Sequence, residues 1–257
     1  MADLASSPLF LLVLVVSALA LPLVFMVWIR NTARFSREPW HMVLKAFLWG
    51  AVFSVIVTIV FSLILLAILG SVQPLNDFVA RRFGDPTIFI GAVIVAPFAE
   101  EAAKGLGVRA GRPATQLRTD GLVYGAAAGL GFSATENLLY GLVVLFAPGG
   151  GPTASLAVIA IRSFSSSFLH ASATAAMGYG IAKTWLTRRT WAFLPFYLLA
   201  VIMHAAFNFL TVAGPTYFQQ YGDMGELIAF AAAAGFAVVA ITIVRFKLAS
   251  HRPAAVR

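Results

Sequence analysis

The chain has 257 residues, of which 60% are hydrophobic and only 11% are charged, and its formal net charge is +8. This balance lies far outside the range of water-soluble domains and is typical of integral membrane proteins. The absence of cysteine excludes disulfide scaffolds, thiol nucleophiles and zinc sites built on thiolates.

Seven apolar runs are long enough to cross the hydrocarbon core of a bilayer as helices, which takes about 20 residues each. In chain order they cover residues 9–29, 46–70, 87–107, 121–147, 154–186, 191–213 and 227–246. The connections are short, and no polar stretch is long enough to fold alone. The sequence therefore predicts an all-α, polytopic membrane helix bundle that forms a single domain over residues 1–257, with the polar residues of a site at about 87–213.

The first run is expected to remain as a membrane anchor with the N-terminus outside. No basic residue precedes it, its apolar core is too long for a cleavable signal peptide, and positive charge follows it instead. Further basic clusters follow the third, fifth and seventh runs, so the positive-inside rule places the C-terminus in the cytosol of a multi-pass plasma-membrane protein. Because topology and anionic lipid headgroups account for these charges, the expected partner is the lipid bilayer and not a nucleic acid.

A strip of glycines begins the fourth run. Gly121, Gly125 and Gly129 recur every four residues and therefore share one helix face. Small residues at this spacing let another helix backbone approach closely. We predict a packing role for this strip and no chemistry.

Ionisable and amide side chains gather in the third to sixth runs, whereas the interiors of the other three runs have almost none. Each ionisable residue at mid-helix costs about 2.5–3.5 kcal/mol to insert, so such residues usually face the bundle interior and serve a site. The set comprises Glu100, Glu101, Lys104, Glu136, Asn137, Arg162, His170, His204 and Asn208.

Helical rise places four of these residues at a similar depth. At about 1.5 Å per residue from the centre of each run, Glu100, Glu136, His170 and His204 lie within about 8 Å of one level. These residues come from four successive runs. A common site is therefore expected at mid-membrane.

The spacing of these residues along each helix also predicts which of them share one helix face. Lys104 lies four residues after Glu100 and three after Glu101, so it can pair with either carboxylate. Two adjacent buried carboxylates resist ionising together, which leaves the other one to share a proton or to act as a base. By the same spacing Phe132 lies on the face of Glu136.

Four ordered motifs give the chain a resemblance to a known family. They are EEAAK at 100–104, FSATEN at 132–137, the segment from Arg162 through HASATAAMGYG at 170–180, and HAAFN at 204–208. Together they resemble the PrsW family of intramembrane proteases, within the wider superfamily of CAAX-processing and bacteriocin-related membrane proteases. The resemblance implies hydrolysis of a peptide bond in or beside the membrane, with the glutamate pair, Glu136 and the two histidines as the active site.

The resemblance also bears on the substrate. The CAAX branch typically has an arginine one position after Lys104 and a histidine at the position of Glu136, so prenylated CAAX substrates are not expected here. The PrsW branch resembles proteases that act on membrane-anchored regulators such as anti-sigma factors. A membrane-anchored protein is therefore the expected substrate.

Amide hydrolysis requires a base that activates water and donors for the oxygen that gains negative charge. Either glutamate of the pair suits the base, either histidine suits water orientation or the oxyanion, and Asn208 supplies a neutral donor on the face of His204. We expect catalytic roles for Glu100, Glu101, Glu136, His170, His204 and Asn208. Supporting roles are expected for Lys104, Phe132, Asn137 and Arg162.

Two mechanisms are compatible with these residues. Metal-free activation of water by a glutamate is preferred, and no cofactor is expected on that mechanism. The alternative is a zinc-bound water held by Glu136, His170 and His204, with a glutamate of the pair as base. A serine nucleophile from SFSSSF at 163–168 is disfavoured because small hydroxyls commonly pack or bond between helices.

Functions of other classes are less consistent with the sequence. A proton-coupled transporter also uses Glu and His at mid-membrane, but its usual internal repeats and paired broken helices are missing from the sequence. A catalytically inactive scaffold is disfavoured because every expected site residue is retained. A protease is therefore the preferred interpretation.

Overall fold

The computed structural model describes residues 7–33, 37–212, 214–217 and 221–250. Within these ranges the chain is helical and contains no strand. The helical segments that are long and apolar enough to span a membrane are Pro8–Thr32, Trp40–Gly70, Pro86–Gly111, Asp120–Phe146, Pro152–Thr187, Leu194–Val212 and Met224–Ser250. The predicted all-α polytopic bundle is confirmed, and each observed span overlaps one predicted run.

Most spans are single helices, and two are built from several helical pieces. The single helices are α1 (Pro8–Thr32), α7 (Asp120–Phe146), α8 (Pro152–Thr187), α9 (Leu194–Val212) and α11 (Asp223–Ser250). The second span joins α2 (Trp40–Leu48), the π-helical turn η2 (Trp49–Ser54) and α3 (Val55–Gly70). The third joins α5 (Pro86–Phe89), the π-helical turn η3 (Ile90–Val95), α6 (Ala96–Gly107) and the 3₁₀ turn η4 (Val108–Gly111). The short helices α4 (Gln73–Phe83) and α10 (Gly214–Tyr217) lie between spans.

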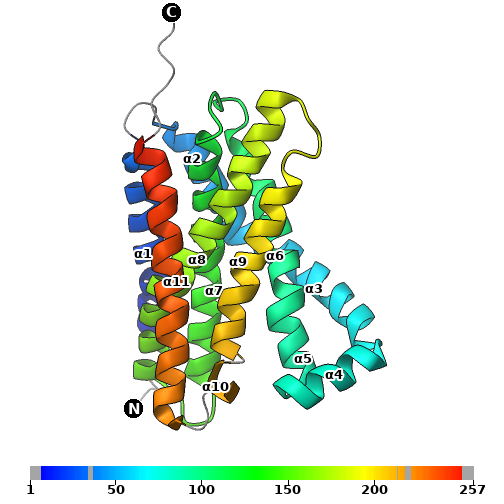
Figure 1. Cartoon of the computed structure of the whole chain (residues 1–257). Coiled ribbons are helices and arrows are strands. Elements are labelled where there is room, and N and C mark those ends of the chain that lie inside the picture. Colours follow the sequence, from blue (N-terminus) through cyan, green and yellow to red (C-terminus); the bar gives the residue numbers. More distant parts are fainter. Residues whose placement is uncertain (1–6, 34–36, 213, 218–220, 251–257) are drawn as a thin grey trace, which may run out of the picture.

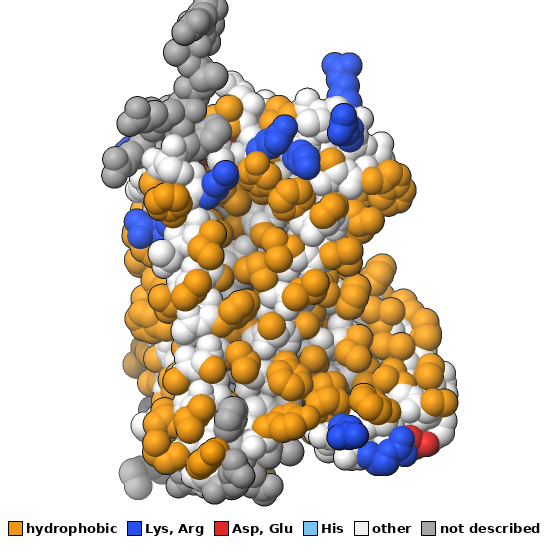
Figure 2. Space-filling view, viewed as in Figure 1, with side chains coloured by type: hydrophobic (Ala, Val, Ile, Leu, Met, Phe, Trp, Pro, Cys, Tyr) orange, Lys and Arg blue, Asp and Glu red, His pale blue; other side chains and the backbone are white. Residues whose placement is uncertain are grey.

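The helices α7 and α8 form the centre of the bundle (Figure 1). Helix α1 packs against both of them, α11 covers α8, and α9 contacts α8, α6 and α11. The arm formed by α3, α4 and α5 projects from the bundle, and α3 exposes most of its apolar side chains. Apolar side chains cover the lateral surface of the molecule (Figure 2), as expected for a protein whose solvent is lipid.

Basic side chains gather at one end of the bundle, the end at which α1 leads to α2 and α8 leads to α9 (Figure 2). A smaller basic group, Arg81 and Arg82, lies on α4 at the opposite end. The asymmetry of charge follows the pattern from which the orientation was predicted. Residues 1–6 and the basic residues Arg34, Arg252 and Arg257, on which that prediction also drew, lie outside the described residues.

The helix that carries EEAAK begins with a π-helical turn. Pro97 has no backbone N–H, and its ring clashes with the carbonyl four residues earlier in a regular α-helix. The wider turn η3 ends at Val95, just before this proline, and accommodates it. The turn was not predicted, although Pro97 inside an apolar run was the signal for it.

The predicted glycine strip packs α7 against α8 at backbone distance. A Cβ atom added to Gly121, Gly125 or Gly129 would lie 2.1–2.2 Å from a backbone oxygen of α8. For Gly129 that oxygen belongs to His170. The strip therefore fixes the helix that carries His170 against the helix that carries Glu136, with no side chain between the two backbones.

We expect the substitution Gly129→Ala to lower the free energy of unfolding by about 1–3 kcal/mol, because the added methyl group forces α7 and α8 apart. SDS-induced unfolding in detergent micelles measures this change. The matched control is Gly235→Ala on α11, where an added Cβ meets nothing within 4 Å. Equal stability of the two variants would contradict the close approach of α7 and α8.

Candidate active site

Four helices bring the predicted ionisable residues into one cluster. Helix α6 contributes Glu100, Glu101 and Lys104, α7 contributes Glu136, α8 contributes His170 and α9 contributes His204. All are buried except Glu136, whose side chain is 19% exposed. The structure thus joins the residues that were expected to share one depth.

Glu101 is the most constrained residue of the cluster and has no exposed surface. Its Oε1 atom lies 2.6 Å from Lys104 Nζ and 3.0 Å from His204 Nδ1. Its Oε2 atom accepts a hydrogen bond of 2.8 Å from Thr174 Oγ1. A carboxylate with three partners is held in place, so Glu101 positions Lys104 and His204. Thr174 was not predicted, although its spacing of four residues from His170 places it on the same face of α8.

Glu100 is held less tightly and faces a cavity. Its Oε2 atom lies 3.4 Å from Lys104 Nζ, 3.7 Å from His204 Nε2 and 4.0 Å from His170 Nδ1. It lines a cavity of about 320 Å³, together with Glu136 and His170. Of the two adjacent glutamates, Glu100 is therefore the one that can meet a molecule in the cavity, a choice that the sequence left open.

A carboxylate holds each of the two imidazole rings. His170 Nε2 lies 2.9 Å from Glu136 Oε2, and His204 Nδ1 lies 3.0 Å from Glu101 Oε1. Lys104 Nζ lies 2.8 Å from His170 Nδ1. Because an ammonium group only donates, His170 Nδ1 accepts this bond and its ring hydrogen lies on Nε2, directed at Glu136. The remaining nitrogen of each ring faces Glu100.

Arg162 is the counter-ion of Glu136, a pairing that the sequence did not specify. Its Nη2 atom lies 2.7 Å from Glu136 Oε2, and its guanidinium group lies 3.7 Å from the centroid of the Tyr140 ring. Both Arg162 and Tyr140 line the same cavity. Tyr140 was not predicted, and its spacing of four residues from Glu136 was the available signal.

Asn137 and the serines of α8 form a hydrogen-bonded contact between helices. Asn137 is fully buried, and its amide nitrogen donates to Ser163 and Ser167, while Arg162 Nε donates to its Oδ1 atom. A further bond of 2.8 Å joins Ser167 to Ser133 of α7. These bonds agree with the packing role expected for the serine-rich segment.

Phe132 and Asn208 complete the predicted set. Phe132 is buried, its ring centroid lies 4.6 Å from Lys104 Nζ and 5.4 Å from that of His170, and so it forms an apolar support for the cluster. Asn208 lines the cavity, and its amide nitrogen donates a bond of 2.8 Å to the carbonyl of Ala92. The second hydrogen of that amide group is available to a ligand.

Three side chains of the cluster could hold a metal ion. Glu100, His170 and His204 each offer one ligand atom, and these atoms lie within 4.8 Å of one another. The set differs from the expected one, in which Glu136 was the carboxylate, because Glu136 instead contacts Arg162 and the far nitrogen of His170.

The chemistry of this donor set fits Zn²⁺. Two histidines and a glutamate are a common set of zinc ligands. A carboxylate that accepts a hydrogen bond from the other nitrogen of a ligating imidazole orients that ring. Glu136 and Glu101 occupy such positions behind His170 and His204. The ammonium group of Lys104, at 2.8 Å from His170 Nδ1, opposes a second cation at this place.

The cavity extends from the cluster toward the end of the bundle that lies opposite the main basic group. Its walls include Val158 near the start of α8, Thr211 near the end of α9 and Phe230 near the start of α11. These helix ends lie together at the lower end of the bundle in Figure 1. A molecule would therefore reach Glu100 from this side.

Comparison with known proteins agrees with the motifs. Residues 38–223 match the model of a family described as PrsW family intramembrane metalloprotease. A protein of Clostridioides difficile strain 630, named Protease PrsW, is 28% identical over 197 residues, which cover 73% of this chain and 74% of that protein. No solved structure shows a significant match to the chain.

We expect Lys104→Met to lower the free energy of unfolding by about 3–5 kcal/mol, because it leaves two buried carboxylates without their shared cation. SDS-induced unfolding measures the loss. The control is Lys183→Met, which removes a lysine of α8 that contacts the Phe196 ring and no carboxylate among the described residues. Adding Glu101→Gln to Lys104→Met should restore part of the stability. The interpretation fails if the two lysine variants are equally stable.

Proposed function

The chain belongs to the PrsW family of intramembrane proteases and is therefore a peptidase of the membrane, and we propose that it hydrolyses peptide bonds with water activated by Glu100. The observation that carries this proposal is that Glu100 and His170 line one cavity within the membrane-spanning bundle, with His204 Nε2 at 3.7 Å from Glu100 Oε2. A water molecule next to Glu100 would meet a substrate in the same cavity.

Glu100 suits the role of general base by its position. Its nearest partner, Lys104 Nζ, lies 3.4 Å away and the histidine nitrogens lie 3.7 and 4.0 Å away, so its carboxylate is held less closely than that of Glu101. His204 donates its Nδ1 hydrogen to Glu101, which leaves Nε2 as an acceptor 3.7 Å from Glu100. One water can donate to both acceptors, which orients its free lone pair toward the substrate.

The proposed reaction moves one proton through Glu100. The water oxygen attacks the carbonyl carbon of the substrate while Glu100 accepts a proton from the water. The second amide hydrogen of Asn208, on the cavity wall, stabilises the charge that develops on the carbonyl oxygen. Glu100 then donates the proton to the departing amine as the C–N bond breaks, so that it returns to its charged form.

The substrate is proposed to be a membrane-anchored protein. The cavity of about 320 Å³ is smaller than one turn of a helix with its side chains and has apolar walls at Val158, Phe207 and Phe230, which suits an extended segment of a chain. The segment would enter from the end of the bundle that was predicted to face outward. The resemblance to the family suggests regulators such as anti-sigma factors as the class of substrate.

A second mechanism is supported by the donor set and by the description of the family as metalloproteases. In it Glu100, His170 and His204 would hold Zn²⁺, which lowers the pKa of a bound water and polarises the substrate carbonyl. Glu136 and Glu101 would then orient the two imidazoles. The metal-free mechanism is retained as the first proposal because Lys104 already supplies a positive charge beside Glu100.

Purified protein should cleave a single-span membrane substrate, and Glu100→Gln, Glu101→Gln, His170→Ala and His204→Ala should each lower the rate at least about 100-fold, because each removes a base or the group that positions it. Gel analysis of a labelled substrate in micelles measures the rate, and retained folding is checked by thermal unfolding. Exposed matched controls are Glu226→Gln and His41→Ala.

Normal turnover in all four site variants would exclude this active site. A proton flux in liposomes that depends on Glu136, without cleavage of any substrate, would instead support a transporter.

Activity should survive exhaustive chelation with phenanthroline, because the first proposal requires no metal. Elemental analysis of the purified enzyme should likewise find no stoichiometric transition metal. One zinc per chain that is lost in His170→Ala or His204→Ala would contradict this expectation. Restoration of activity by zinc in the chelated parent enzyme, and not in these variants, would establish the second mechanism.

A further inference from the structure

A second cavity lies on the face of α6 opposite to the cluster of Glu100, Glu101 and Lys104. It has a volume of about 470 Å³ and separates the end of α6 from the end of α8 and the start of α9. Ala102, Gly105 and Leu106 of α6 form one wall. We propose that this cavity binds an anionic phospholipid of the surrounding membrane, with an acyl chain along the apolar walls and the phosphate at Arg109 and Arg112.

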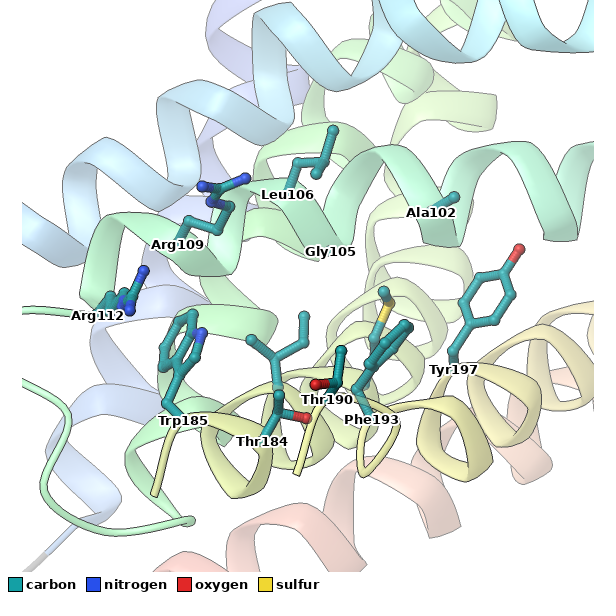
Figure 3. Close-up of a pocket in the computed structure, with 12 residues that line it drawn as sticks. Ala102, Gly105, Leu106, Arg109, Arg112, Thr184, Trp185, Thr190, Phe193 and Tyr197 are labelled. Carbon is teal, nitrogen blue, oxygen red and sulfur yellow. The ribbon is translucent and has the colours of Figure 1, made fainter. Parts of the chain in front are cut away.

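The cavity is amphipathic along its length. Figure 3 shows Arg109 and Arg112 at one end, and Ala102 and Tyr197 at the other. Between these ends lie the apolar side chains of Leu106 and Phe193 together with Thr184 and Thr190, and Trp185 lies beside the arginines. A ligand that fits this distribution has a negative charge at one end and a long apolar part at the other.

The two arginines are available to an anion. Among the residues that the structure describes, no carboxylate lies within ion-pair distance of Arg109 or Arg112, and both side chains are exposed. The guanidinium carbon of Arg112 lies 6.0 Å from the centroid of the Trp185 ring. Arg109 also lines a neighbouring cavity of about 650 Å³ that contains Lys45, so a third positive charge lies near this rim. Charge complementarity therefore favours an anionic ligand.

The position of the arginines favours a lipid over a soluble anion. They lie at the end of the third span, at the end of the bundle where the basic side chains gather. Trp185 lines the cavity, and Trp191, in the following turn, is 72% exposed. Tryptophans are enriched at the level of the lipid headgroups, so phosphate groups of the membrane are at this depth.

The size of the cavity favours a lipid over a protein segment. A helix with side chains is about 10 Å wide and rises about 5.4 Å per turn, so one turn alone occupies about 400 Å³. The volume of about 470 Å³ holds little more than one turn. A single acyl chain is far thinner and can follow the cavity along its length.

A bound acyl chain would pack against the face of α6 that points away from the ionisable cluster. Met177 of α8 already packs so closely on Gly105 that an added Cβ would lie 2.1 Å from its Cε atom. Glu101 on α6 bonds to His204 on α9, so the distance between these two helices affects the cluster directly. Binding of a lipid at this cavity does not depend on the proposed proteolysis.

The test uses the full chain in nanodiscs of phosphatidylcholine, into which phosphatidylglycerol is introduced stepwise. Native mass spectrometry counts retained lipids, and thermal unfolding reports stabilisation. We expect retention of phosphatidylglycerol over phosphatidylcholine, and a loss of affinity of at least about tenfold in the double variant Arg109→Gln with Arg112→Gln. The matched control, Arg118→Gln with Arg189→Gln, removes two exposed charges from the same end outside this cavity and should retain the lipid.

A second variant tests the apolar part. Ala102→Phe fills the cavity but leaves both arginines in place, so it should also reduce retention. Equal retention by the parent and the Arg109→Gln, Arg112→Gln variant would overturn the proposal. Equal losses of lipid in both double variants would also overturn it, because they indicate non-specific attraction to the charged surface. Displacement of the lipid by a single-span peptide with an acidic end would overturn it as well, because it indicates a protein ligand.

Discussion

The burial of Lys104 and Glu101 at membrane depth is the constraint on which the arrangement of the site depends. Neither side chain has exposed surface, and their charged atoms lie 2.6 Å apart. Isolated charges at this depth are costly, so each must be paired and hydrogen-bonded. Glu101 meets this requirement with His204 and Thr174, which come from two other helices. The same bonds that neutralise the pair therefore fix α6, α8 and α9 around Glu100.

Close helix packing makes this network geometrically possible. The side chains of the network are short or only moderately long, so the helices that carry them must approach closely. Glycines of α7 allow this approach, since its backbone contacts α8 directly beside the carbonyl of His170. Glu136 on α7 then reaches the His170 ring at 2.9 Å. The glycine strip of α7 therefore helps to position the imidazole of His170, although the glycines have no side chains that could take part in chemistry.

The two faces of helix α6 contact different surroundings. One face presents carboxylates and a lysine to the interior, and the other presents Ala102, Gly105 and Leu106 to a cavity near the basic end of the bundle. The π-helical turn η3 directly precedes this helix. The ionisable cluster and the second cavity therefore lie on opposite faces of one helix, so the packing of α6 is common to both.

The sequence by itself determined the seven spans and the set of polar residues, because transfer into a bilayer depends on local composition and helical rise sets depth. It also identified the glycine strip from its spacing. Only the tertiary structure decided that Glu100 faces the cavity while Glu101 binds His204, since adjacent residues differ by the rotation of α6 and not by depth. The structure likewise shows that Glu136 contacts Arg162 and His170, whereas Glu100, His170 and His204 offer the atoms that could hold a metal ion. Rotation depends on packing against neighbouring helices, which hydropathy does not encode.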